Sequence, residues 1–430
     1  MFAMKSSSLK IIGYAGTVIT LSTLTLSLLN PKSLMINYQK NDFTDRPAEP
    51  SFFNISTLNI KKPEEIQQFR NGSKRSAFYR SEEEHQLSKV SSTRSLVVNH
   101  GLHSASKSSP IKSDSFILIS GDQGLIQVLD KVTHKLHWKL QLYDSNLGIH
   151  SSPVTFADYA LIGDYSGKLY FLNLLEKSII WISDWGDTFG ASPLLEEENL
   201  YVNVETSRPA DGFVAKLNIL TQEVLWMTPF LGEQSHSSLA ADKTGLFFGN
   251  NNGHFFKLDK NTGDIMWKIE LERPIKSTPA IFENLIIFSS WDGHVNAFDK
   301  NTGLLAWSYY LGKDTNQSSL AVSEDHAYGA INSAFGFSIL DLKTGALVKE
   351  FKMKTAKASR MASPIILQNK ISTRVLTPCA EDQICIVDLS TLELRVLPLD
   401  KRLGSSGQLT PVGKRIYFSP NQEHALHYIE

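Results

Sequence analysis

Cysteine is scarce in this chain of 430 residues, which contains only two, Cys379 and Cys385. Two thiols cannot supply a disulfide framework, a four-thiolate zinc site or an iron–sulfur cluster. Excess charge is missing as well, because 43 Lys and Arg residues face 44 Asp and Glu residues and leave a net charge of -1. Since nucleic-acid binding depends on a basic electrostatic field, we expect no nucleic-acid partner.

One long uncharged run is present near the N-terminus, Ile11–Leu29, and lysines flank it on both sides. This pattern indicates an export signal or a membrane anchor. We expect residues 1–30 to form a hydrophobic helix that stays uncleaved as a signal-anchor in the inner membrane, and residues 31–93 to form a flexible tether. The rest of the chain would lie in the periplasm or outside the cell. Cleavage would instead give a secreted form. The region contains no cysteine, which excludes an N-terminal lipid-modified Cys.

A tetrad of small residues that ends in Pro, or twice in Leu, recurs eight times from residue 107 onward, at intervals of 40 to 47 residues. The copies begin at Lys107, His150, Gly190, His236, Lys276, Gln317, Met361 and Gln408. A period of this length indicates a repeat fold that is built from one supersecondary unit per copy.

A stretch of ten residues recurs between the tetrads, and Leu258–Trp267 (LDKNTGDIMW) is a well preserved copy. In such copies Asp and Asn cap a turn, while Gly263, Gly303 or Gly345 supplies the positive φ that the turn requires. Short runs with strand periodicity lie on both sides of the turn, so that each unit supplies four strands. This pattern predicts an all-β fold, an eight-bladed β-propeller of four-stranded blades.

The number of blades depends on how the last unit is completed. That unit stops at Ile429-Glu430 and lacks its fourth strand, whereas residues 94–98 (RSLVV), before the first tetrad, supply a short β-branched run. We expect this N-terminal strand to pair near His424–Tyr428 and to close the ring. The propeller would then span residues 94–430. The alternative is a seven-bladed ring with residues 409–430 outside it.

A tryptophan closes five of the ten-residue stretches. The positions are Trp138, Trp181, Trp226, Trp267 and Trp307. The combination of Thr-Gly and Trp resembles the repeat of the pyrroloquinoline-quinone-type (PQQ-like) propellers, and the resemblance covers residues 108–430. In that family the Trp packs between neighbouring blades, which agrees with the burial of a broad aromatic face where two twisted sheets meet. The resemblance therefore implies that these five residues are structural docking residues.

The PQQ-like family divides into quinoprotein dehydrogenases and non-enzymatic scaffolds. The dehydrogenases hold the quinone with a calcium ion and an Asp base, and many have a vicinal disulfide, but this chain has no Cys-Cys pair. It also lacks Cys-x-x-Cys-His, the attachment motif of a fused haem. We therefore predict no catalytic residue, no metal and no cofactor. PQQ with calcium belongs only to the alternative, a ligand-binding or quinone-dependent redox propeller that uses its central funnel.

The first residues of the tetrads are candidates for the rim of the central funnel. Because the first strand of each blade lines the central channel, their side chains would surround one mouth of it. The candidates are Lys107, His150, His236, Lys276, Gln317 and Gln408. Such a polar ring is typical of a solvated rim, and it is also where a ligand would bind.

Cys379 and Cys385 bracket a predicted hairpin turn of the seventh unit. A cross-strand disulfide is sterically reasonable at this spacing, and export into an oxidising compartment would favour it. Two small free thiols that face neighbouring packing are the equal alternative. The pair does not have the Cys-x-x-Cys spacing of a redox motif.

Among PQQ-like propellers, the chain is similar to the propeller lipoproteins of the outer-membrane β-barrel assembly machinery, which also have eight blades, although it lacks their lipid-modified Cys. The similarity implies an exported, membrane-tethered, non-enzymatic propeller that acts as a protein-interaction scaffold in envelope protein assembly. Its partners would be other envelope or membrane proteins, and the propeller itself would be a monomer.

Overall fold

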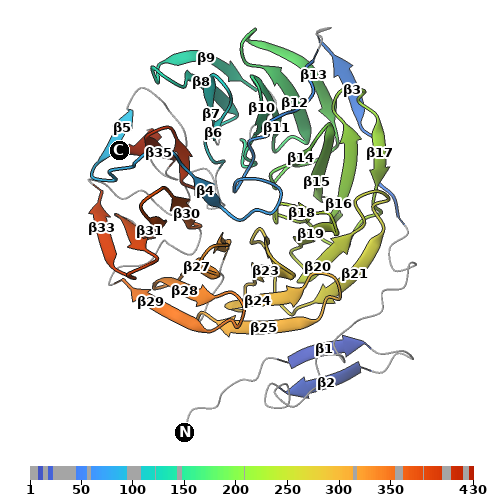
Figure 1. Cartoon of the computed structure of the whole chain (residues 1–430). Coiled ribbons are helices and arrows are strands. Elements are labelled where there is room, and N and C mark those ends of the chain that lie inside the picture. Colours follow the sequence, from blue (N-terminus) through green and yellow to red (C-terminus); the bar gives the residue numbers. More distant parts are fainter. Residues whose placement is uncertain are drawn as a thin grey trace.

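Eight antiparallel sheets stand around a central axis as the blades of a propeller (Figure 1). The structure is a computed structural model that describes residues 45–55, 60–93, 108–121, 123–142, 148–207, 209–312, 317–353, 362–380, 382–399, 408–419 and 426–430, and the backbone of two strands nearer the N-terminus. The prediction of an eight-bladed all-β propeller is confirmed, and the seven-bladed alternative is wrong.

Blades 1 to 4 follow one another along the chain. Blade 1 contains β6 (Ile111–Lys112), β7 (Phe116–Ser120), β8 (Leu125–Asp130) and β9 (Leu136–Gln141). Blade 2 contains β10 (Val154–Phe156), β11 (Tyr159–Gly163), β12 (Lys168–Asn173) and β13 (Ser178–Asp184). Blade 3 contains β14 (Leu194–Glu196), β15 (Asn199–Ser207), β16 (Ala210–Asn218) and β17 (Val224–Met227). Blade 4 contains β18 (Ala240–Asp242), β19 (Gly245–Gly249), β20 (His254–Leu258) and β21 (Ile265–Glu270).

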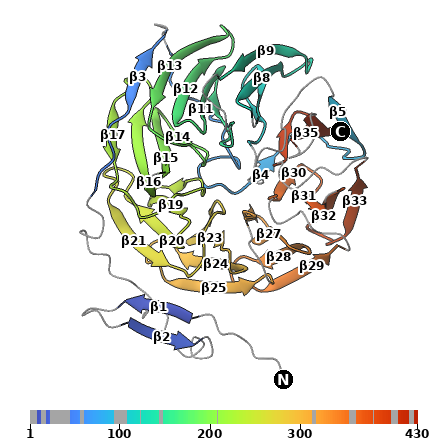
Figure 2. The same cartoon turned by 180° about the vertical axis from the view of Figure 1, so that it is seen from behind.

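Blades 5 to 8 complete the ring (Figure 2). Blade 5 contains β22 (Ala280–Phe282), β23 (Leu285–Ser289), β24 (His294–Asp299) and β25 (Leu305–Tyr310). Blade 6 contains β26 (Ala321–Ser323), β27 (Tyr328–Ser333), β28 (Gly336–Asp341) and β29 (Leu347–Lys352). Blade 7 contains β30 (Ile365–Gln368), β31 (Thr373–Ala380), β32 (Gln383–Asp388) and β33 (Leu394–Pro398). Blade 8 contains β34 (Thr410–Val412), β35 (Arg415–Phe418) and β36 (Leu426–Ile429), and a strand from the N-terminal region completes it.

The core lies between the blades. Every residue of β7 and of β19 is buried, because a second strand has a neighbouring blade on each of its two faces. The outer strand β25 instead alternates between buried or half-buried and exposed positions. The continuous apolar runs of the middle strands therefore reflect burial on both faces.

The structure places the predicted docking tryptophans at blade junctions. Trp181, Trp267 and Trp307 are buried, and Trp138 and Trp226 are half-buried. Three of the indole Nε1 groups donate to a backbone carbonyl of the next blade. These bonds run from Trp181 to Ile219 (3.3 Å), from Trp226 to Lys260 (3.1 Å) and from Trp307 to Leu342 (2.8 Å).

The Thr-Gly turns receive the indoles of Trp226, Trp267 and Trp307. Gly263 and Gly345 have φ angles of +76° and +74°, which favour glycine. A Cβ atom would lie 2.6 Å from the Trp226 ring at Gly263, and 2.6 Å from the Trp307 ring at Gly345. Glycine is thus required both for the backbone conformation and for the close approach of the indole. The Thr-Gly turn of one blade and the Trp of the preceding blade are therefore the two sides of one contact between blades.

The predicted hydrophobic helix is absent from the described part of residues 11–29. There β1 (Ser8–Ile12) and β2 (Val18–Ser22) pair as a two-stranded antiparallel sheet. β1 contains Ile11 and Ile12, and β2 contains Val18, Ile19 and Thr20; β-branched residues of this kind favour strand over helix. Among the described residues, no helix has the length and the apolar character that a membrane span requires. The remainder of the predicted anchor lies outside the described residues.

The closing strand of the ring begins earlier than predicted. It is β5 (Val90–Thr93), which pairs antiparallel with β36. The predicted strand, residues 94–98, lies outside the described residues. The N–H groups of Ser88 and Lys89 both donate to the carbonyl of Glu430 and fix where β5 starts. The position of this strand could not be predicted from the spacing of the repeats. In the other blades a hairpin fixes the distance between the third and fourth strands, whereas no hairpin joins β36 to β5.

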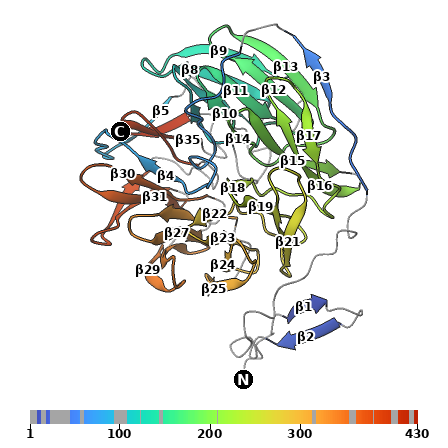
Figure 3. The same ribbon diagram turned by 45° about the vertical axis from the view of Figure 1, so that its right-hand side comes forward.

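The described part of the expected tether, residues 45–55 and 60–93, lies against the propeller, so a flexible tether is the wrong description for it. β3 (Ser51–Asn54) adds an antiparallel strand to the outer edge of blade 2 (Figure 3). β4 (Phe78–Arg80) adds a parallel strand to the inner edge of blade 7. At both places the edge strand of a blade supplies hydrogen-bond partners for the backbone N–H and C=O groups of this region.

Candidate functional site

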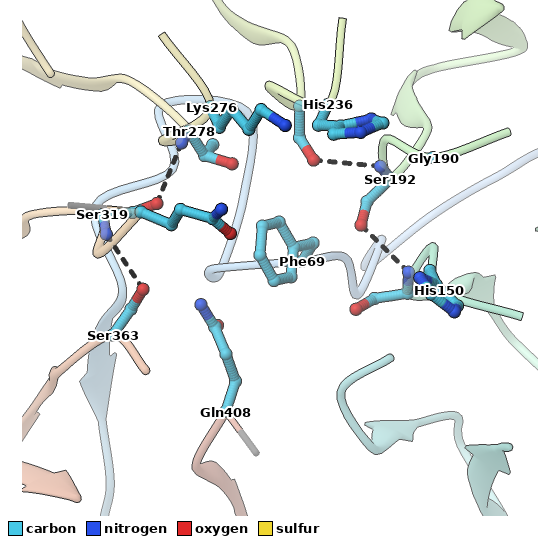
Figure 4. A pocket seen from close by; sticks show the side chains of 13 residues that line it. Phe69, His150, Gly190, Ser192, His236, Lys276, Thr278, Ser319, Ser363 and Gln408 are labelled. Carbon is cyan, nitrogen blue, oxygen red and sulfur yellow. Dashed lines mark hydrogen bonds between the residues drawn. The ribbon is translucent and has the colours of Figure 1, made fainter. Parts of the chain in front are cut away.

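The predicted rim residues surround one cavity at a mouth of the central channel (Figure 4). They come from different blades, because each tetrad precedes the innermost strand of its blade. The structure brings together His150, His236, Lys276, Gln317 and Gln408. Lys107, the sixth candidate, lies outside the described residues.

The third residue of the tetrad links neighbouring blades around this mouth. Its backbone N–H donates to the hydroxyl of the same residue in the next blade, at 2.9 Å in every case. The pairs are Ser109 with Ser152, Ser152 with Ser192, Ser192 with Ser238, Thr278 with Ser319, and Ser319 with Ser363. The tetrad therefore supplies a short hydroxyl side chain where the blades converge, a role that the sequence repeat alone did not reveal.

Three of the rim residues have polar or aromatic partners, and one of these is His150, whose ring centroid lies 4.2 Å from that of Tyr165. His236 Nδ1 lies 2.6 Å from Oε1 of Glu205, and Glu205 is buried. The Lys276 ammonium lies 4.5 Å from the centroid of the Trp291 ring. Burial lowers the pKa of Lys276, while Glu205 and Glu233 act in the opposite direction. The rim thus carries its own countercharges.

The channel behind the rim is filled by residues 66–80, called here the channel segment (Figure 1). It contacts six blades in order, and an equivalent N–H of each innermost strand donates to it at 2.8 to 3.0 Å. The donors and acceptors are Thr155 to Gln67, Leu195 to the Gln68 side chain, Ala241 to Ser73, Ile281 to Lys74, Val322 to Ser76, and Ile366 to Ala77. The channel segment therefore covers strand edges that would otherwise stay open toward the axis.

Arg75 fixes the channel segment to blades 3 and 4. Its guanidinium is fully buried, with Nη2 donating to the carbonyl of Pro193 at 2.9 Å and Nε to that of Leu239 at 2.8 Å. Nη1 donates to the carbonyl of Phe69 at 2.5 Å, within the channel segment itself. Burial and, to a smaller extent, nearby Arg70 lower the pKa of Arg75 to about 9. The Arg75 guanidinium therefore stays protonated at neutral pH, and backbone carbonyls replace water as its hydrogen-bond acceptors.

Arg70 makes the corresponding contact to blade 6. Its Nη2 donates to the carbonyls of Leu320 at 2.6 Å and Ser319 at 3.3 Å, and burial lowers its pKa to about 10. The two arginines therefore hold different sides of the channel at once. A planar fork of donors suits this geometry better than the point charge of a lysine.

The cavity between the rim and the channel segment is small. Its volume is about 30 Å³, and Phe69 lies at its centre (Figure 4). A space of this size holds about two water molecules at most, whereas ligand pockets typically measure about 300–1,000 Å³. A quinone does not fit in the mouth while the channel segment is in place. Among the described residues, no group of three or more His, Cys, Asp and Glu side chains could hold a metal ion.

Cys379 and Cys385 form a disulfide, and both are buried in blade 7. Of the two alternatives that the sequence left open, the structure contains the bonded form. Neither cysteine lines the cavity at the channel mouth.

A family model described as outer membrane protein assembly factor BamB matches residues 210–427, which is just over half of the 430 residues. The chain belongs to the BamB family. The BamB protein of Legionella pneumophila (strain Paris) is 23% identical over 196 residues, which are 43% of this chain and 49% of that protein. The chain thus spans about half the length of this curated relative.

Solved structures agree with the BamB fold. The crystal structure of BamB from Moraxella catarrhalis gives a TM-score of 0.58 at 16% identity, over 79% of this chain and 97% of that one. A europium-containing methanol dehydrogenase gives a TM-score of 0.63 at 11% identity, over 82% of this chain and 88% of that one. Both similarities concern the fold alone. The PQQ-like resemblance inferred from the repeats is confirmed.

The sequence located the rim of this BamB-family propeller but missed what lies beneath it. Arg70, Arg75 and Phe69 belong to no repeat, so periodicity could not single them out. A usable signal was present, because a solvated tether has no reason to contain the apolar residues Phe69, Phe78 and Tyr79 so close to two arginines.

Proposed function

We propose that this chain is a protein-interaction scaffold that takes part in the assembly of outer membrane proteins. Membership of the BamB family supports this role, and the closed channel carries the proposal. The chain's own residues fill the place where a funnel ligand would bind, which leaves the outer faces and strand edges of the propeller for partners. Those partners would be other proteins of the cell envelope.

We also propose that the chain works in the envelope. The uncharged run at Ile11–Leu29 between lysines supports export, and the Cys379–Cys385 disulfide agrees with an oxidising compartment. The N-terminal region would hold the propeller at the inner membrane. A quinone-dependent reaction would require the channel segment to leave the channel and to break its hydrogen bonds to six blades.

Crosslinking from the two faces of the ring tests this function. Val132 and Leu175 lie in turns between third and fourth strands and are 82% and 59% exposed. Phe335 lies in a turn between second and third strands, at the opposite face of the ring, and is 65% exposed. A photoreactive residue at each position of the full chain in its native cells would capture proteins in contact with either face.

We expect adducts with outer membrane assembly proteins or their substrates from one face, and few from the other. Mass spectrometry of the adducts identifies the partners. The proposed function is wrong if neither face yields an envelope protein while the chain is present at its normal level.

A further inference from the structure

A second cavity, with a volume of about 340 Å³, lies on one face of blade 7 beneath the chain that leads to β5. It occurs where the docking contact is missing. Strands β32 and β33 pair without the register shift seen in blade 5, so Arg395 stands opposite Ile386 where Trp307 of blade 5 stands opposite Ala297, and no hairpin turn of blade 8 is available to receive an indole. His85 and Leu87 of the N-terminal region cover this junction instead, and both are buried. They leave a space of ligand size beside them.

Two arginines line this cavity from the same face of the sheet. Arg374 of β31 stands opposite Asp388, and Arg395 of β33 stands opposite Ile386. Since Ile386 and Asp388 are two residues apart on β32, all four side chains share one face. The two guanidinium groups are near enough to influence each other, because burial and then Arg374 lower the pKa of Arg395.

Each arginine uses little of its hydrogen-bonding capacity. Arg374 Nη1 donates to the carbonyl of His85 at 3.4 Å, and Arg395 Nη2 donates to that of Leu87 at 2.8 Å. Within the described part of the chain, neither guanidinium has a carboxylate oxygen within 4.0 Å. A guanidinium has five N–H donors, so this pair of positive charges retains donors for an oxyanion.

Three carboxylates also line the cavity, and they decide the kind of ligand. Asp388 is committed to its own turn, where the Ser390 hydroxyl and N–H donate to it at 2.5 and 2.9 Å. Glu84 and Glu393 are exposed and stand at the rim. A simple anion would be attracted by the arginines and repelled by this rim, whereas a ligand with an anionic and a cationic end would satisfy both.

We propose that this cavity binds a small zwitterion, with its oxyanion on Arg374 and Arg395 and its ammonium group toward Glu84 and Glu393. The chemistry is shared by an amino acid and by the phosphoethanolamine headgroup of a lipid. The site is independent of the central channel and of the proposed scaffold function.

Calorimetric titration of the full chain tests the proposal with four probes: phosphoethanolamine, glycine, inorganic phosphate and ethanolamine. We expect at least one zwitterion to bind about tenfold more tightly than phosphate or ethanolamine, since each of these lacks one of the two charges. Vesicles that contain phosphatidylethanolamine, compared with vesicles that lack it, distinguish a lipid source from a free amino acid.

Variants place the binding in this cavity. Arg395→Gln and Glu393→Gln should each weaken the zwitterion by about tenfold, whereas Arg273→Gln, at an exposed position of the loop between blades 4 and 5, should leave it unchanged. Glu393 is exposed, and no hydrogen bond or ion pair joins its carboxylate to another described residue, so we expect its loss to leave folding intact; thermal unfolding checks this for both variants. The proposal is overturned if no zwitterion binds, if phosphate binds as well as the zwitterion, or if Glu393→Gln has no effect.

Discussion

At the scale of single residues, the centre of the molecule is held by polar groups whose partners are almost all backbone atoms. The tetrad hydroxyls accept N–H groups of the preceding blade, and Arg70 and Arg75 donate to carbonyls of three blades. A buried charge without such partners would be very unfavourable. The specificity of these contacts therefore lies in geometry, which predicts that conservative substitutions are not tolerated.

Arg75→Lys keeps the charge but removes the fork that reaches Pro193 and Leu239 together. We expect the free energy of unfolding to fall by about 2–4 kcal/mol, because buried carbonyls lose their donors. Urea unfolding followed by tryptophan fluorescence measures the change. Arg273→Lys at an exposed position is the control, and it should change stability by less than about 0.5 kcal/mol. Equal midpoints for the two variants would contradict this role of Arg75.

Gly263→Ala separates the two requirements of the Thr-Gly turn. The added methyl group meets a left-handed backbone and the Trp226 ring at 2.6 Å, whereas at Gly413, with φ of +56°, a Cβ meets nothing within 4 Å. We expect Gly413→Ala to cost about 1–2 kcal/mol from backbone strain alone. Gly263→Ala should cost about 1–3 kcal/mol more from the collision. Similar losses in thermal unfolding would mean that the indole contact does not constrain this glycine.

At the scale of elements, the repeated units could be predicted from the sequence and the N-terminal region could not. Strand periodicity, Thr-Gly turns and docking Trp residues recur, so that each copy supports the interpretation of the others. The channel segment occurs once and is extended, and its bonds depend on open edges of six blades that exist only after the ring has formed. β3 and β4 likewise join sheets far away in sequence. Local sequence signals do not encode such long-range pairing.

The junction of blade 8 with blade 1 should respond to pH. The Tyr417 hydroxyl is hydrogen-bonded to Nδ1 of His134 at 2.5 Å. Burial lowers the pKa of His134, and Arg415 lowers it further. Burial also lowers the pKa of His85 at the junction with blade 7. As the pH falls below the ordinary value of 6.5, the unfolded chain takes up protons that the folded chain resists, so the free energy of unfolding decreases.

The His134→Asn variant tests this contribution, because Asn tolerates the left-handed φ of 57° at this position. Denaturant midpoints at pH 7.5 and pH 5.5 should differ less for the variant than for the unaltered chain. The same difference in both proteins would show that His134 does not contribute to the pH response.

At the scale of the whole molecule, the N-terminal region turns a row of repeats into a closed and filled ring. β5 completes blade 8, the channel segment ties six blades together at the axis, and β3 covers an outer edge of blade 2. Proteins of similar fold include both dehydrogenases and assembly factors, so the fold alone does not decide the function. The function depends on which residues form the binding sites. Here the chain itself occupies the channel, and this observation supports the proposal that the molecule is a scaffold.

Hydrogen exchange of the full chain, read by mass spectrometry, tests this central claim most directly. If the channel segment is seated, the amides of Ala77 and of Ala241, Ile281, Val322 and Ile366 in the innermost strands should exchange as slowly as those of the buried strand β23. Residues 66–80 should then be protected as one unit under native conditions. Complete exchange of residues 66–80 within seconds, with rapid exchange of the innermost strand amides, would contradict the account and leave the central channel open.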